Sequence, residues 1–195
     1  MRKRWITALL ALAMAIPIRA LADNAAWNGF RGLSWGAFEE DIAEQEERLA
    51  DSSRELGGLC LDLLYDGVSV SRFKNAQAAY ILYDGELVCG GYAVTVTDEE
   101  DETYLSQALT ELYGQPNADG RLIFRTIYGL LSQEDENASI LETAPTAWHV
   151  DGTGILFYPE GDRLIILYIG MDYLNSMDVE DDAEAEAEEL DTDGL

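Results

Sequence analysis

The sequence predicts an α+β fold in which a helix is followed by an antiparallel β-meander, used twice around one shared core. Two observations support this prediction. Apolar residues at helical spacing begin near residues 37 and 97, and each segment is followed by runs rich in valine, isoleucine, leucine and tyrosine. The two αβββ halves would span about 30–97 and 98–173. Their similarity is weak, so coincidence between two ordinary α+β segments is the alternative.

The stretch AFEEDIAEQEERLA predicts the first helix. Three of the four positions on one helical stripe, Phe38, Ile42 and Leu49, are apolar. The acids that follow Phe38 suit the first turn, where the helix dipole favours negative charge. Gly57 and Gly58 are expected to end the helix.

Strands are expected on both sides of the turn YDGEL, because an Asp-Gly pair between strand-forming residues is typical of a β-hairpin. Gly90 and Gly91 indicate a bulge or a close backbone approach within the later strand. The predicted strands of the first half are Leu59–Tyr65, Ala76–Tyr83 and Glu86–Thr97.

The second helix is predicted to begin at Thr97, because Thr97 and Glu100 match a capping box. Gly114 and Pro116 match its end. Its inward stripe comprises Tyr104, Leu105, Ala108, Leu109, Leu112 and Tyr113. The next segment, RLIFRTIYGLL, fits either a strand or a short helix, and three strands follow in AWHV, GILFYP and RLIILYIGM.

Residues 1–22 predict a secretory signal peptide: MRKR is a basic start, an apolar run follows, and Ala20 and Ala22 are small residues before a cleavage point. The alternative is a membrane anchor, but a spanning helix needs about 20 apolar residues and this run is shorter. We therefore expect the domain of residues 23–177 to be exported, to the periplasm or outside the cell, with no transmembrane anchor after cleavage.

Charge is the strongest signal in the composition. The chain has 12 basic and 38 acidic residues, a formal charge of −26, which disfavours nucleic acid and anionic membrane surfaces as partners. Residues 178–195 are densely acidic and contain no base, so they predict a disordered tail. Oxygen ligands at this density allow weak divalent cation binding by the tail, without the glycine that an EF-hand loop requires.

Two cysteines, Cys60 and Cys89, allow a disulfide in an exported chain. The alternative is that both are small buried residues of strands. Sequence leaves both alternatives open, because it does not supply the Cβ geometry that a disulfide needs.

The stretch FRGLSWGAFEEDI resembles the start of a group of exported, uncharacterised bacterial proteins. The matching residues are Trp35, Gly36, Glu40, Asp41 and Ile42. The helix-then-meander unit is similar to the small lipoprotein of the outer-membrane assembly machine, and its tandem form to the β-lactamase inhibitor protein. Both are non-catalytic binders, so the resemblance implies a binding module. Phe38 departs from the Ser/Thr cap of the pattern, and the lipid-anchoring cysteine is absent.

No residue is predicted to be catalytic, to bind a cofactor or to ligate a structural metal. His149 is the single histidine and is expected to be an ordinary surface or half-buried residue rather than a base. Among the aromatic residues, most are expected to pack in the core, Trp35 included. Trp27 and Tyr128 lie outside strongly periodic segments, so we expect them to be exposed and to contact a partner.

The sequence therefore predicts an exported, non-enzymatic protein that binds a protein or peptide. Two other classes stay open: a hydrolase that uses paired carboxylates, and an acidic cation-binding protein in which the tail is the active part.

Overall fold

The computed structural model describes residues 28–57, 59–131 and 144–177. The predicted signal peptide, Trp27 and the predicted acidic tail lie outside these ranges. The elements are β1 (Gly29–Phe30), β2 (Leu33–Ser34), α3 (Glu39–Gln45), β3 (Ser52–Gly57), β4 (Cys60–Val70), β5 (Phe73–Tyr83), β6 (Glu86–Thr95), α4 (Glu99–Tyr113), α5 (Gly120–Leu131), β7 (Thr146–Val150), β8 (Thr153–Glu160) and β9 (Arg163–Gly170). Residues 171–177 are also helical.

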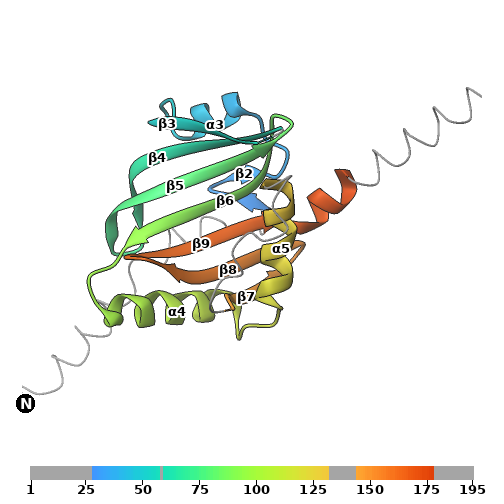
Figure 1. The fold of residues 1–195 in the computed structure, drawn as a ribbon. Helices are drawn as coiled ribbons and strands as arrows, with labels where there is room; N and C mark the ends of the chain where they lie inside the picture. Colours follow the sequence, from blue (N-terminus) through green and yellow to red (C-terminus); the bar gives the residue numbers. More distant parts are fainter. Residues whose placement is uncertain (1–27, 58, 132–143, 178–195) are drawn as a thin grey trace, which may run out of the picture.

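Seven strands form one antiparallel sheet in the order β3-β4-β5-β6-β9-β8-β7 (Figure 1). Strands β3 to β6 make a four-stranded meander, and strands β7 to β9 make a three-stranded one. The two meanders are joined where β6 pairs with β9. Strands β1 and β2 form a separate two-stranded hairpin. The mixed α+β class predicted from the sequence is confirmed. Within the described residues, no helix is long and apolar enough to cross a bilayer.

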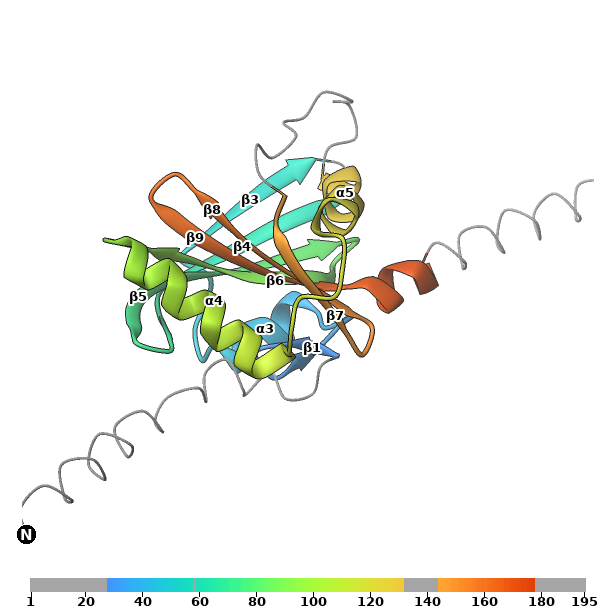
Figure 2. The same ribbon diagram turned by 90° about the horizontal axis from the view of Figure 1, so that it is seen from below.

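The helices cover the sheet on opposite faces. Figure 2 shows α3, α4 and β1 on one side of the strands and α5 on the other. One buried cluster contains residues of β1, α3 and α4, and a second contains residues of α5 and Leu174. We call these the α4 face and the α5 face.

The α4 face is closed by aromatic packing. Phe30 is fully buried, and its ring centroid lies 5.0–5.5 Å from those of Tyr80, Tyr92 and Tyr168. This ring sits against the backbone of β6: a Cβ added at Gly90 would lie 2.2 Å from Phe30 Cδ1. The predicted close approach at this glycine is confirmed, whereas the β6 bulge falls between Leu87 and Cys89.

A partly buried ion pair holds the β1–β2 hairpin and α3 on this face. Arg31 Nε lies 2.6 Å from Glu46 Oε1, and the Glu46 side chain is only 6% exposed. The Tyr80 hydroxyl donates to the same carboxylate. Burial, and then this hydrogen bond, raise the pKa of Tyr80. One interaction therefore links the hairpin, the first helix and β5.

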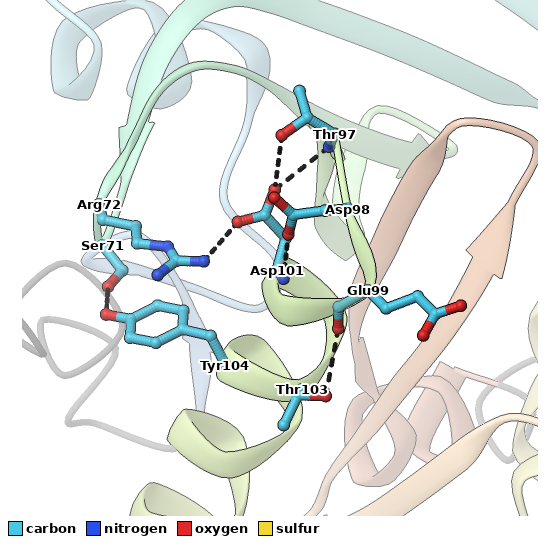
Figure 3. A network of polar contacts seen from close by, with 8 residues as sticks. All are labelled: Ser71, Arg72, Thr97, Asp98, Glu99, Asp101, Thr103 and Tyr104. Carbon is cyan, nitrogen blue, oxygen red and sulfur yellow. Dashed lines mark hydrogen bonds and ion pairs between the residues drawn. The ribbon is translucent and has the colours of Figure 1, made fainter.

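A second polar network attaches α4 to the β4–β5 turn (Figure 3). Arg72 forms an ion pair with Asp101 and lies over the Tyr104 ring, 4.1 Å from its centroid. The Ser71 and Tyr104 hydroxyls are 2.6 Å apart. These contacts place the start of α4 beside a turn that is far away in sequence.

The first helix is shorter than predicted, and the missed element is β3. Helix α3 has seven residues, and Glu47 then takes φ 56°, which reverses the chain. Leu49, expected to face inward, is 80% exposed. Asp51 N donates to Leu64 O at 2.8 Å, so pairing with β4 starts here and supplies hydrogen bonds that a longer helix would have provided internally.

The other local predictions are confirmed, except for the residue that caps the start of α4. Asp84 and Gly85 have φ of 50° and 84°, as a type I′ hairpin turn requires. The N-cap of α4 is Asp98 rather than Thr97, since Asp98 Oδ1 accepts from Asp101 N at 3.1 Å. Gly114 caps the other end with φ 80°.

The segment that the sequence left ambiguous between strand and helix is a helix, α5. Trp35 is buried, as predicted.

Candidate ligand-binding groove

A groove with a volume of about 590 Å³ runs over the α5 face of the sheet. Its floor comes from β3, β4, β5, β6, β8 and β9, and its wall comes from α5. In Figure 1, α5 lies over one end of β8 and β9 and leaves the rest of the sheet uncovered by a described helix on this face. The groove is therefore the part of this sheet face that α5 does not reach.

Small residues make the floor low. Ala79 pairs with Gly91, and Gly91 pairs with Leu167, so one cross-strand row carries little side-chain volume at its centre. In the next row, Ala93 is small and pairs with the larger Ile165. Ala79, Ala93 and Leu167 are half-buried although they are apolar. A ligand in the groove would therefore meet an apolar surface that remains partly in contact with water.

The wall is aromatic. Phe124 and Tyr128 stack on α5 with their ring centroids 6.0 Å apart, and Phe124 meets Tyr158 of β8 edge to face. Helical spacing places Phe124 and Tyr128 on one side of α5, and Ile127 beside them packs into the buried cluster. Burial, with a smaller effect from Glu160, raises the pKa of Tyr158. This side of the groove therefore offers flat apolar contact area.

A buried carboxylate, Asp62, lies at the β3 side of the groove. The residue is 4% exposed. Its Oδ2 lies 3.0 Å from Arg54 Nη2, while Oδ1 accepts no hydrogen bond from any described residue. Burial raises the pKa of Asp62, and the neighbouring Arg54 opposes the rise. A buried acceptor without a donor costs about 1–3 kcal/mol, so this carboxylate is held at a cost to stability.

A second charged pair lies at the other end. Glu160 and Arg163 are cross-strand partners at the β8–β9 turn, and both side chains are exposed. They line the same groove as Asp62 and Arg54. Each arginine of the groove therefore has a carboxylate residue as its cross-strand partner, and Asp62 Oδ1 is a buried acceptor without a described donor.

The residues singled out from the sequence are dispersed. Tyr128, expected to contact a partner, is half-buried in the groove wall. His149 is exposed on β7, and its backbone N–H donates to Asn117 Oδ1 at 2.8 Å. Across the described ranges, no three of His, Cys, Asp and Glu are grouped so as to hold a metal ion.

Cys60 and Cys89 are both buried and are not joined in a disulfide. Cys60 lies on β4 and Cys89 on β6, with β5 between them. Two strand spacings amount to about 10 Å, whereas the Cα atoms of a disulfide are within about 7 Å of each other. The fold therefore keeps the two thiols apart. Burial is the main cause of the raised pKa of Cys89, and the charge of Asp62 adds to it.

Sequence reasoning does not single out Asp62 or Arg54. Asp62 lies within LCLDLL, where alternation marks it as the solvent side of a half-buried strand. Arg54 fits the end of the first helix as the sequence predicts it, but the observed helix α3 ends at Gln45 and Arg54 lies on β3. A signal is present nevertheless, because an acid flanked by leucines is an unusual residue for a strand interior. Only the β3–β4 pairing brings the two residues together.

No protein-family model matches the chain, and neither a curated protein nor a solved structure is significantly similar to it.

Proposed function

We propose that this protein is an exported, non-enzymatic binding protein that holds an apolar segment of a protein or peptide in the groove on the α5 face. The observation that carries the proposal is an apolar floor of small residues beside an aromatic wall, partly open to water, on an otherwise well-packed sheet. Binding sites for apolar ligands are concave, mostly apolar and contain few polar groups.

Export is supported by residues 1–22, whose basic start, apolar run and small residues have the form of a signal peptide. Pulse labelling with detection of a shorter mature chain outside the cytoplasm would test it. A full-length chain retained in the cytoplasm would contradict this part of the proposal.

The likeness to tandem helix-and-meander binders remains part of the proposal. Its support is the order of elements, in which α3 precedes a four-stranded meander, and α4 and α5 precede a three-stranded one. The extra strand β3 and the second helix α5 are departures from two equal αβββ halves.

The binding function is tested by selecting peptides from a randomised display library on the purified protein. Peptides held in the groove are expected to lose binding to Ala79→Trp, which fills the centre of the floor. They should keep binding to Leu49→Trp, which adds the same side chain at an exposed position outside the groove. A library without specific binders, or binders indifferent to Ala79→Trp, would remove the groove as the site.

A carboxylate hydrolase is the second candidate, because Asp62 has a raised pKa and the groove also holds Glu160. The register places these residues on β4 and β8, four strands apart. That corresponds to about 19 Å across the sheet, whereas the two carboxyls of a glycosidase lie roughly 5–10 Å apart. The geometry therefore favours binding. Hydrolysis of a glycoside panel that disappears in Asp62→Asn would reverse this preference.

A further inference from the structure

The polar content of the groove indicates what kind of peptide it accepts. Asp62 Oδ1 is buried, belongs to a carboxylate, and accepts no hydrogen bond from a described residue. Buried polar atoms are almost always satisfied, so such an atom at the edge of a groove calls for a donor. A ligand that brings an N–H group would satisfy it.

The donor is best supplied by a cation. The chain has a formal charge of −26, so its field attracts cationic segments and repels anionic ones. The aromatic wall lies on α5 and β8, so it offers apolar contact area to the rest of the peptide.

Access to Asp62 depends on Arg54. Its guanidinium contacts Asp62 through one bond to Oδ2, and the Arg54 side chain is 67% exposed. When the exposed guanidinium moves away it regains contact with water, and an incoming cation replaces it as the partner of the buried Asp62 carboxylate. An incoming cation then meets a carboxylate whose second oxygen is already unsatisfied.

Resting on the proposed function, we infer that the groove binds an apolar peptide segment carrying one lysine or arginine, whose cationic group pairs with Asp62. The apolar residues on either side of this cation lie on the floor around Ala79 and Ala93. Asp62 is then the specificity-determining residue of the groove.

The test uses three end-blocked pentapeptides that differ at the central residue of Leu-Val-Xaa-Val-Leu, with Xaa as arginine, citrulline or glutamate. Citrulline keeps the shape of arginine, one N–H group and one NH₂ group, but a carbonyl oxygen replaces the second terminal nitrogen and the charge is lost. Calorimetry on the full-length protein is expected to give arginine the tightest binding, with citrulline weaker by about tenfold and glutamate weaker still.

Substitutions of Asp62 and Arg54 test whether the preference for the arginine peptide arises at this carboxylate. Asp62→Asn is expected to reduce the preference for arginine over citrulline to about twofold, while Glu102→Gln, a matched change on α4 outside the groove, leaves it intact. Arg54→Gln is expected to tighten binding of the arginine peptide by about threefold, because it removes the competing guanidinium. A purely structural role of the Arg54–Asp62 pair would instead weaken binding in both variants.

The outcomes separate the two proposals. Equal binding of the arginine and citrulline peptides, or a preference for glutamate, overturns the inference while the groove function stands. The inference is also overturned if the display library yields groove binders without basic residues and the arginine pentapeptide does not bind. Equally strong binding of spermidine would show that charge alone is recognised, and would likewise overturn it. Absence of any binder in both experiments removes both proposals.

Discussion

On the α4 face, the strands present Tyr80, Tyr92 and Tyr168 to a fully buried phenylalanine, and helices close the surface. On the α5 face, the neighbouring residues of the same strands are Ala79, Gly91 and Leu167, and much of the surface is left open. Because side chains alternate along a strand, one set of strands builds a dense core on one side and a hollow on the other. The two faces can therefore serve different purposes.

The buried charges differ in the same way. On the α4 face Glu46 is paired with Arg31 and also accepts from Tyr80, whereas on the α5 face Asp62 keeps an oxygen without a described donor. The buried charge of the α4 face is therefore better satisfied than that of the α5 face, where we propose the binding site. Five predictions test the difference, starting with the largest expected effect.

Phe30→Ala is expected to lower the free energy of unfolding by about 4 kcal/mol, because it leaves a cavity among three tyrosine rings. Leu64→Ala, on the groove floor, is expected to cost only about 1 kcal/mol since Leu64 is half-buried. Urea unfolding of both variants measures the two losses. Equal losses would show that the two faces contribute alike.

Gly90→Ala is expected to cost about 3 kcal/mol, because the new methyl group would collide with the Phe30 ring. Gly129→Ala is the matched control, since a Cβ at this position on α5 meets nothing within 4 Å. It should stabilise the protein by about 0.5–1 kcal/mol through helix propensity. Thermal unfolding of the pair distinguishes crowding at Gly90 from a general effect of alanine.

Arg31→Met is expected to cost about 2 kcal/mol, because it leaves the buried Glu46 carboxylate without its countercharge. Arg125→Met removes an exposed arginine from α5 and should change stability by less than about 0.5 kcal/mol. Chemical unfolding at pH 7 compares the two. A loss confined to Arg125→Met would contradict the role given to the α4 face.

Asp62→Val is expected to raise the free energy of unfolding by about 1 kcal/mol at pH 7, since it removes a buried carboxylate that is only partly satisfied. The pKa of Asp62 is raised above its ordinary value of 3.8, so the folded state binds the proton more tightly than the unfolded state. The penalty of ionised Asp62 is therefore absent below pH 3.8 and grows as the pH rises through the folded-state pKa. The advantage of the variant should shrink between pH 7 and pH 4, which urea unfolding across this range measures.

Asp101→Asn is expected to have the smallest effect. The N–H of Thr97 is the main cause of the lowered pKa of Asp101; burial opposes this shift, and Arg72 adds to it. The stability that ionised Asp101 contributes is therefore present above its ordinary value of 3.8 and is lost as the pH falls through the lower folded-state pKa. The variant should unfold at a slightly lower temperature than the parent at pH 7, and this difference should shrink as the pH falls below 3.8 and as salt is added. A difference that persists unchanged at pH 2 would assign it to packing instead.

Local signals predict the elements whose hydrogen bonds and caps lie close together in sequence. Helix α4 ends at Gly114 as predicted, and Asp84-Gly85 forms the predicted turn, because a positive φ is required there and the sequence supplies residues that accept it. The predicted first helix is too long, since Leu49 fits its stripe but the chain reverses at Glu47 to pair with β4. Helical periodicity over one short segment does not reveal a competing strand partner.

The groove is not predictable in the same way. Alternation along β5 marks Ala79 as facing away from Tyr80, but it does not indicate what covers that side. Weak periodicity is the only sequence signal at Tyr128, and its place in the wall depends on α5 crossing one end of the sheet. Asp62 and Arg54 meet only because β3 exists and pairs in this register.

Sequence alone suffices for the α+β class, the main hairpin, the second helix and the strong negative charge. These follow from residue spacing, turn chemistry and composition, which act over a few residues or over the whole chain. The three-dimensional fold is needed to learn which face of the sheet is closed, which carboxylate is buried and where the groove lies. Those features depend on strand order and on the crossing of a helix, and both are set by contacts between residues that are far apart in the chain.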